Sequence, residues 1–206
     1  ASMKTALHYV GVLALICAMA AGLLATVHEI TSEPIASSRK RVTLEAVRTV
    51  LPPFETLADA ETVKTIVTDP SAPEMAAAFS AGRLIGAAVK VTDPDGFGGD
   101  VTFMVGVTSD AKVHAIRLLA HKETPGLGTK LGDPIFTKQF QGLAIPAGGL
   151  RVHKDGGTIQ AITGATISSR TATRAATRAV EHFEKVKNQL AQAASQAQPA
   201  QGGPRG

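Results

Sequence analysis

The feature that most constrains this 206-residue chain is an apolar run near its start. Residues 5–27 contain no Asp, Glu, Lys or Arg, and residues 10–27 are almost wholly apolar. At about 1.5 Å of rise per residue, a helix of this length crosses the roughly 30 Å hydrocarbon core of a bilayer. A cleavable secretory signal is the alternative, but the run is long for one and no clear small-residue cleavage site precedes Glu29. We therefore predict a transmembrane helix over residues 5–28.

A second helical pattern follows the apolar run and ends at a proline pair. Apolar side chains recur at helical spacing from Val42 to Leu51, and Pro52-Pro53 stop the pattern. This predicts a stalk helix over residues 29–53 and a folded domain over residues 54–190. From residue 191 onward Gln, Ala, Gly and Pro dominate, which predicts a disordered tail over 191–206.

The middle of the domain has the pattern of an antiparallel sheet. Three β-rich runs are separated by short turn signals, and short turns join antiparallel neighbours. The runs are residues 84–92, 100–107 and 112–119, and the turns are residues 93–96 and 109–110. Residues 61–68 partly alternate and predict a further strand, whereas residues 76–79 fit either a strand or a short helix. Helices predicted over 133–140 and 168–190 would cover one face of the sheet, which gives an α+β domain.

Composition excludes several classes of function. The net charge is only +4 and the basic residues are scattered, which argues against a nucleic-acid interface. The lone cysteine, Cys17, excludes an internal disulfide and a cysteine-rich zinc or iron–sulfur site. The six histidines show no ligand spacing, so we predict no metal site. Without a Ser-His-Asp signature, a P-loop or a dinucleotide fingerprint, the chain alone is not expected to bind NADH.

A glycine turn rich in hydroxyls precedes the last helical pattern. The turn is Thr163-Gly164-Ala165-Thr166, and residues 158–162 before it alternate and favour a strand. Hydroxyls at a helix N-terminus lie beside unpaired amides and the positive end of the helix dipole, an environment that favours a phosphate. Gly164 would let the backbone approach closely. The local pattern leaves an alternative open, in which Thr163 or Thr166 simply caps the helix.

Two further glycine motifs lie upstream of this turn. They are Gly96-Phe97-Gly98-Gly99, which precedes a β-rich run, and residues 121–128, which read His-Lys-Glu-Thr-Pro-Gly-Leu-Gly. Taken alone, each fits a turn or loop.

Together the motifs resemble one known family. Thr163 to Thr166, followed by Ile-Ser-Ser, resembles the Ser/Thr-Gly-Ala-Thr flavinylation motif of the FMN-binding domain. That domain occurs in the G subunit of Rnf complexes and in the C subunit of the sodium-pumping NADH:quinone oxidoreductase. The other two motifs, then Phe136 and Phe140, occur in the family's order, and the resemblance spans residues 4–190. One departure is Gln160, at a position that is often acidic in the family.

The resemblance implies a covalent cofactor, FMN joined by a phosphoester bond to Thr166. It also implies that the loop from Glu123 to Gly128 lies beside the isoalloxazine ring and that residues 96–99 pack nearby. The cofactor-binding residues predicted in this way are Thr163, Gly164, Ala165, Thr166, Ser168, Glu123, Thr124, Gly126, Leu127 and Gly128. Arg170 follows the turn closely enough to neutralise a phosphate, and Lys130 and Lys154 are weaker candidates for that role.

The resemblance also implies a function. It predicts a membrane-anchored flavoprotein subunit of an Rnf-type complex, which exchanges electrons between ferredoxin and NAD⁺ and couples the flow to ion translocation. Its expected partners are the other membrane and iron–sulfur subunits and a flavin transferase, and no complete active site is expected in this chain alone. The alternatives are the C subunit of the sodium-pumping quinone reductase and a membrane-tethered assembly or binding protein of the same fold without flavin.

The orientation in the membrane is predicted differently by two lines of reasoning. Arg39-Lys40-Arg41 follow the apolar run closely, so the positive-inside rule would place the domain in the cytoplasm. The resemblance implies instead a protein of the bacterial inner membrane whose FMN domain is periplasmic, and we follow it.

Overall fold

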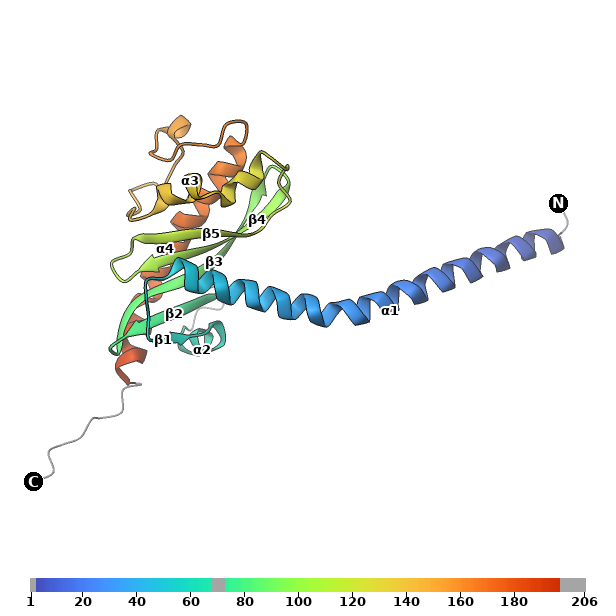
Figure 1. Ribbon diagram of the computed structural model, residues 1–206, viewed down its shortest axis with the longest axis horizontal. Helices are drawn as coiled ribbons and strands as arrows, with labels where there is room; N and C mark the ends of the chain where they lie inside the picture. The colour runs from blue at the N-terminus through green and yellow to red at the C-terminus, as the bar shows by residue number, and fades with distance from the viewer. Residues whose placement is uncertain (1–2, 68–72, 197–206) are drawn as a thin grey trace, which may run out of the picture. The chain divides into compact units, whose positions relative to one another are not determined.

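The computed structural model describes residues 3–67 and 73–196 (Figure 1). The described residues form two compact units, which divide between Val42 and Thr43. Its elements, in chain order, are α1 (Met3–Val50), β1 (Thr56–Ala58), α2 (Ala60–Ile66), β2 (Met75–Ser80), β3 (Arg83–Gly96), β4 (Gly99–Thr108), β5 (Val113–Ala120), the 3-10 helix η1 (Gly128–Gly132), α3 (Pro134–Thr137), the 3-10 helices η2 (Lys138–Phe140) and η3 (His153–Asp155), and α4 (Thr166–Gln196).

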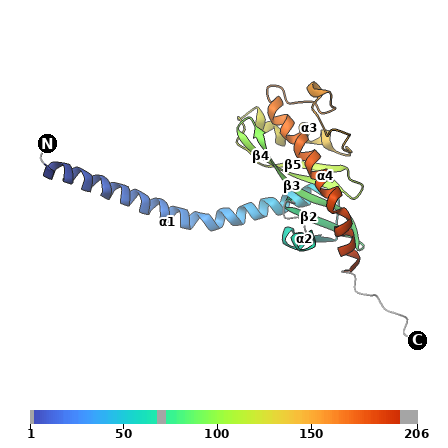
Figure 2. The same cartoon turned by 180° about the vertical axis from the view of Figure 1, so that it is seen from behind.

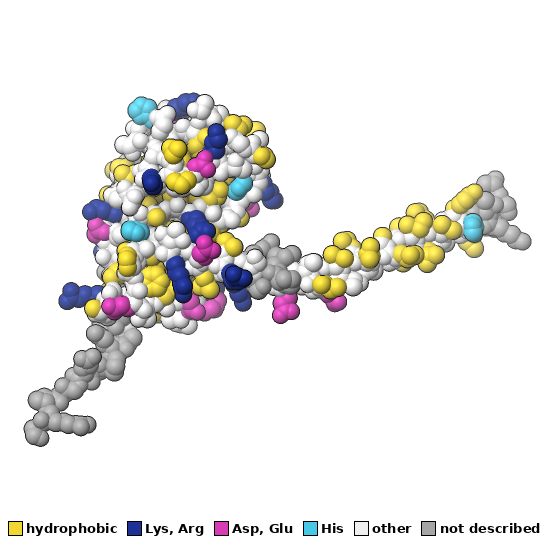
Figure 3. All heavy atoms as spheres, in the orientation of Figure 1, with side chains coloured by type: hydrophobic (Ala, Val, Ile, Leu, Met, Phe, Trp, Pro, Cys, Tyr) yellow, Lys and Arg dark blue, Asp and Glu magenta, His cyan; other side chains and the backbone are white. Residues whose placement is uncertain are grey.

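The first unit consists of α1 up to Val42. Within it, Leu7–Glu33 is 27 residues long with a mean hydropathy of 2.5, which is long and apolar enough to cross a membrane. Its apolar side chains are exposed, as the yellow spheres along this helix in Figure 3 show. The boundary predicted between membrane helix and stalk has no counterpart in the helix itself, because α1 is continuous to Val50. It ends two residues before Pro52.

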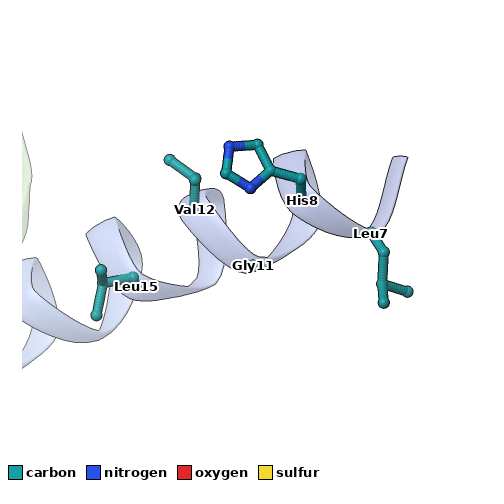
Figure 4. A pocket seen from close by; sticks show the side chains of 5 residues that line it. All are labelled: Leu7, His8, Gly11, Val12 and Leu15. Atoms are coloured by element: carbon teal, nitrogen blue, oxygen red, sulfur yellow. The ribbon is translucent and has the colours of Figure 1, made fainter. Parts of the chain in front are cut away.

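A shallow hollow occurs on this same helix. It is lined by Leu7, His8, Gly11, Val12 and Leu15 (Figure 4). All five residues belong to neighbouring turns of one helix, and Gly11 leaves the space between their side chains. The hollow therefore follows from a missing side chain in an apolar segment and is no candidate for a polar ligand.

The second unit is built on a five-stranded antiparallel sheet. The strand order follows the chain, β1-β2-β3-β4-β5, so each strand pairs with its neighbour in sequence. The longest ladder joins β3 to β4 and runs from Gly86–Thr108 to Gly96–Gly99. This confirms the predicted α+β class and the antiparallel arrangement of the central strands.

Helix α4 covers one face of the sheet (Figure 2). Small side chains at Ala172, Ala176 and Ala179 let the helix approach, and Phe183 and Leu190 are fully buried further along it. Phe136 and Phe140 complete the same core and pack against each other edge to face, with ring centroids 5.5 Å apart.

The last turns of α1 cover part of the opposite face. Val47 and Val50 pack there against Met104 and neighbouring alanines of the sheet. Gly106 makes this possible, because a side chain at that position would collide with the carbonyl oxygen of Val50. Arg117 on β5 donates to Thr49 Oγ1 over 2.9 Å and to Glu45 over 3.3 Å. The sheet is therefore covered on both faces, which the sequence did not predict.

The predicted strand over residues 61–68 is wrong, because α2 occupies Ala60–Ile66. Asp59 accepts hydrogen bonds from the Thr62 amide at 2.9 Å and from its hydroxyl at 2.7 Å, which caps a helix. Val63 and Val67 then fall on one buried side at helical spacing. Thr68 lies outside the described residues.

Other boundaries also differ from the sequence prediction. The predicted turn at 93–96 is wrong: β3 continues to Gly96 and the turn lies at Phe97-Gly98. The predicted strand at 158–162 is reduced to one parallel bridge between Val152 and Ile159. The helix predicted at 133–140 is present as α3 followed by η2. Residues 191–196 are helical rather than part of a tail, since Ala and Gln are good helix formers, and the rest of the predicted tail lies outside the described residues.

Candidate functional site

The turn before α4 is held by Ser169 rather than by a threonine cap. Gly164 has a left-handed φ of +78°, which glycine adopts without strain. The Ser169 hydroxyl accepts from the Ile162 amide at 3.0 Å and donates to the Ala165 carbonyl at 2.9 Å. Among the described hydrogen bonds, none runs from a backbone amide to the hydroxyl of Thr163 or Thr166. The structure thus gives the capping alternative no support.

Thr166 is the first residue of α4 and is partly buried. The contact that its Oγ1 makes in the described structure is with Lys154 Nζ, at 3.5 Å. A threonine hydroxyl next to an ammonium group and at a helix N-terminus can accept a phosphoryl group without giving up a capping bond.

Glu123 joins the three glycine motifs. Its carboxylate is buried, with 6% of the residue exposed, and accepts from the Ser168 hydroxyl at 2.7 Å and from the Gly98 amide at 3.3 Å. A side chain at Gly96 would lie 2.6 Å from its Oε1, and one at Gly128 would collide with its Oε2. Segments up to 45 residues apart in sequence therefore meet at one carboxylate.

The loop around Glu123 has a tightly fixed path. A side chain at Gly98 would collide with the carbonyl oxygen of Lys122. His121 Nδ1 accepts from the Glu123 amide at 3.2 Å, so this histidine holds the loop. The Gly126 amide donates to Thr129 Oγ1 at 3.0 Å, and Gly126 has a φ of +76°.

The remaining predicted residues lie at the surface of the same region. Leu127 is 43% exposed and lies against the turn, since a Cβ added to Gly164 would be 3.2 Å from its Cδ2. The Leu127 amide donates to the Thr124 carbonyl at 3.2 Å, and Thr124 is exposed. Ile167, next to Thr166, is also half exposed. An apolar surface thus adjoins the threonine hydroxyl.

Two arginines of α4 form bidentate ion pairs in this region. Arg170 contacts Asp155 at 2.7 and 2.8 Å, and Arg174 contacts Asp93 at 2.8 and 2.6 Å. Arg178 lies 3.4 Å from the same Asp93. Arg170 is therefore already paired, which weakens its case as the phosphate-neutralising residue, whereas Lys154 contacts the threonine hydroxyl.

The pKa values of these carboxyl groups follow from their partners. Burial acts to raise the pKa of Asp93, but hydrogen bonds from Arg174 and the Asp95 amide and the charges of Arg174 and Arg178 bring it below its usual 3.8. The hydrogen bonds from Arg170 likewise hold the pKa of Asp155 below its usual value.

Gln160, the departure from the family pattern, is exposed, and its backbone is held by Gln139. The Gln160 amide donates to Gln139 Oε1 at 2.7 Å, and Gln139 Nε2 donates to the Gln160 carbonyl at 3.2 Å. The segment leading into the turn is thus fixed through main-chain atoms. No property of the Gln160 side chain is needed for this.

Comparison with known proteins identifies the family. The model of the FMN-binding domain matches residues 96–181. The G subunit of the ion-translocating oxidoreductase complex of Vibrio cholerae is 31% identical over 199 residues, covering 91% of this chain and 95% of its own length. The chain belongs to the family of G subunits of ion-translocating oxidoreductase complexes. This confirms the resemblance predicted from the three glycine motifs.

Another member and one solved structure are also similar. The G subunit of the corresponding complex of Pseudomonas aeruginosa is 29% identical over 202 residues, covering 92% of this chain and 94% of that protein. The crystal structure of Shewanella oneidensis NqrC covers 56% of this chain and 59% of that chain, with 26% identity and a TM-score of 0.47. With its apolar helix, the present chain is a single-pass, membrane-anchored member of the G-subunit family.

The residues present fit a flavin mononucleotide. The Thr166 hydroxyl is not used as a cap, and an ammonium group suited to a phosphate lies beside it. The half-exposed Leu127 offers an apolar surface next to the same turn. Glu123 and Ser168 bind each other at 2.7 Å, so in this structure they connect the motifs rather than face the surface.

Proposed function

We propose that this chain is the FMN-carrying electron-transfer subunit of an Rnf-type complex, with the flavin attached through its phosphate to Thr166. The complex would pass electrons between ferredoxin and NAD⁺ and couple the flow to ion translocation, with this domain on the periplasmic side. The observation that carries the proposal is the Thr166 hydroxyl at the N-terminus of α4, which accepts from Lys154 Nζ at 3.5 Å and makes no capping bond among the described hydrogen bonds.

The chain's own residues have three tasks in this proposal. Ser169 and Gly164 hold the turn so that the Thr166 hydroxyl stays available. Glu123 keeps the loop 121–128 and the 96–99 turn against the start of α4. Leu127 presents an apolar surface for the ring. FMN itself supplies the electron chemistry when bound, while the protein sets its position and surroundings.

Attachment can be written with its atoms in balance. A bond forms between Thr166 Oγ1 and the phosphorus of the FMN moiety while the pyrophosphate bond of a flavin dinucleotide breaks. AMP leaves with the electron pair, and the hydroxyl proton passes to solvent. A flavin transferase would supply the donor. The other membrane and iron–sulfur subunits of the complex would exchange electrons with the attached flavin.

The test is an intact mass after co-production with a flavin transferase. The full chain should gain on the order of 440 Da, the mass of FMN less water, and should fluoresce as a denatured band. Thr166→Ala should gain nothing, whereas Thr163→Ala, which removes the neighbouring exposed hydroxyl, should still be modified. A wild-type chain of unmodified mass would contradict the proposal and favour a membrane-tethered binding protein of the same fold.

A further inference from the structure

Lys154 is presented by a loop with little freedom to move. The loop, residues 151–157, contains η3 and is held at its base by the His153 amide, which donates to the Ile159 carbonyl at 2.7 Å. Gly156 has a φ of +81°, and a side chain at Gly157 would collide with the Arg151 carbonyl oxygen. The backbone that carries Lys154 is therefore closely packed.

The same loop is attached to α4 by the adjacent residue. Asp155 forms its bidentate pair with Arg170, one turn beyond Thr166. This contact brings Lys154 to the start of the helix and at the same time compensates the charge of Arg170. Arg170, the first basic residue of α4, therefore already has a carboxylate partner in the absence of a bound anion.

Lys154 keeps its charge unpaired in this arrangement. Its Nζ lies 3.5 Å from Thr166 Oγ1, and in the described part of the chain no carboxylate lies within ion-pair distance of it. An ammonium group has three donors, and this contact uses at most one of them. The residue therefore has both charge and hydrogen-bonding capacity left for a ligand attached to the neighbouring oxygen.

We propose that Lys154 is the residue that pairs with the flavin phosphate at Thr166, and that Asp155 and Arg170 are positioning residues that hold it there. This rests on the proposed function. A phosphodiester carries one negative charge, and one ammonium group matches it. During attachment, the same ammonium compensates the charge on the phosphate oxygens as the pyrophosphate bond of the donor breaks.

The test measures the initial rate at which purified, unmodified full chain gains FMN from flavin dinucleotide and a limiting amount of transferase, followed by intact mass. Lys154→Met should slow this rate about tenfold, and Lys154→Arg, which keeps the charge, should restore most of it. Lys138→Met is the matched control, because Lys138 is an exposed lysine of the same domain outside the site, and it should react like wild type.

A second measurement separates electrostatics from misfolding. The ratio of the wild-type rate to the Lys154→Met rate should shrink as ionic strength rises, because salt screens an exposed charge, while the unfolding midpoints of the unmodified proteins should coincide. If wild type is modified and Lys154→Met reacts equally fast at every salt concentration, the role of Lys154 is overturned while the proposed function stands. If wild type itself gains no mass, it is the proposed function that fails.

Discussion

The two arginine–carboxylate pairs of α4 have nearly the same geometry but different surroundings. Arg174 meets Asp93 of β3, which is fully buried, whereas Arg170 meets Asp155 of η3, whose side chain is 34% exposed. Both pairs are bidentate with distances of 2.6 to 2.8 Å. The two pairs thus differ in burial and not in geometry, so we expect the Arg174–Asp93 pair to contribute more to folding than the Arg170–Asp155 pair.

Each pair also anchors a different segment to the same helix. Asp93 belongs to the end of β3, close to the 96–99 turn, and Asp155 belongs to the loop that carries Lys154. Arg174 and Arg170 lie one helical turn apart, so α4 holds both segments from one side. The first pair stabilises the junction of sheet and helix. The second attaches to α4 the loop whose Lys154 contacts the Thr166 hydroxyl.

The largest expected effect comes from breaking the buried pair from its cationic side. Arg174→Met leaves the buried Asp93 carboxylate with Arg178, 3.4 Å away, as its remaining basic partner, and with the hydrogen bond from the Asp95 amide. The free energy of unfolding should fall by about 3 kcal/mol, the lower end for a broken buried pair, because Arg174 is itself partly exposed. Urea unfolding of the full chain in detergent, followed by circular dichroism, measures this loss. Arg170→Met should cost clearly less, and equal losses would contradict the comparison.

A smaller effect should appear in the pH dependence of stability. Because the folded-state pKa of Asp93 lies below 3.8, its contribution is fully present above that pH and is lost as the pH falls through the folded value. Wild type should therefore have a larger free energy of unfolding than Asp93→Asn at about pH 6, and the difference between the two free energies should decrease steadily toward about pH 2. Unfolding curves of both proteins across this range test it. A difference that stays constant would mean that the charge of Asp93 does not stabilise the fold.

The sheet could be predicted because its signals are local. The β-rich runs and the Ser109-Asp110 turn lie where the sequence places them. The turn at 93–96 was misplaced because Asp-Pro-Asp-Gly is a typical turn sequence, while in the structure the segment continues β3 and Asp93 pairs with Arg174, 81 residues away. Similarly, α2 was missed because Val63, Ile66 and Val67 were interpreted as the partial alternation of a strand, although their spacing also fits a helix. The hydrogen bond that caps the segment at Asp59 decides for the helix.

The candidate site could be located by its motifs but not assembled from them. The family resemblance pointed to Thr166, Glu123 and the glycine turns, whose positions in this chain are adjacent in the structure. The sequence did not show that Glu123 is buried against Ser168, that Arg170 is paired with Asp155, or that Lys154 contacts the Thr166 hydroxyl. These are contacts between distant segments, and no periodic pattern encodes them.

Breaking the exposed Asp155–Arg170 pair should have the smallest effect on stability, but it should lower the rate of flavin attachment. Asp155→Asn keeps the shape of the side chain and removes its charge, so the bidentate ion pair between the loop 151–157 and Arg170 is reduced to at most a hydrogen bond to a neutral acceptor. Exposed ion pairs contribute little to folding, so the unfolding midpoint should stay close to that of wild type. The rate of flavin attachment at Thr166 should nevertheless fall several-fold, because the loop that carries Lys154 is then held less firmly to the start of α4.

A matched control for this last prediction is Asp110→Asn. Hydrogen bonds from Lys112 and Thr108 hold the pKa of Asp110 at about 2, so it too is an exposed carboxylate with a strong basic partner. It lies in the turn between β4 and β5, and its side chain's hydrogen bond and ion pair in the described part of the chain are with Thr108 and Lys112. Asp110→Asn should change neither stability nor attachment rate. If both variants slow flavin attachment alike, surface charge in general steers the transferase, and the Asp155–Arg170 pair has no positioning role. If only Asp155→Asn slows attachment, the exposed pair acts through the loop that carries Lys154.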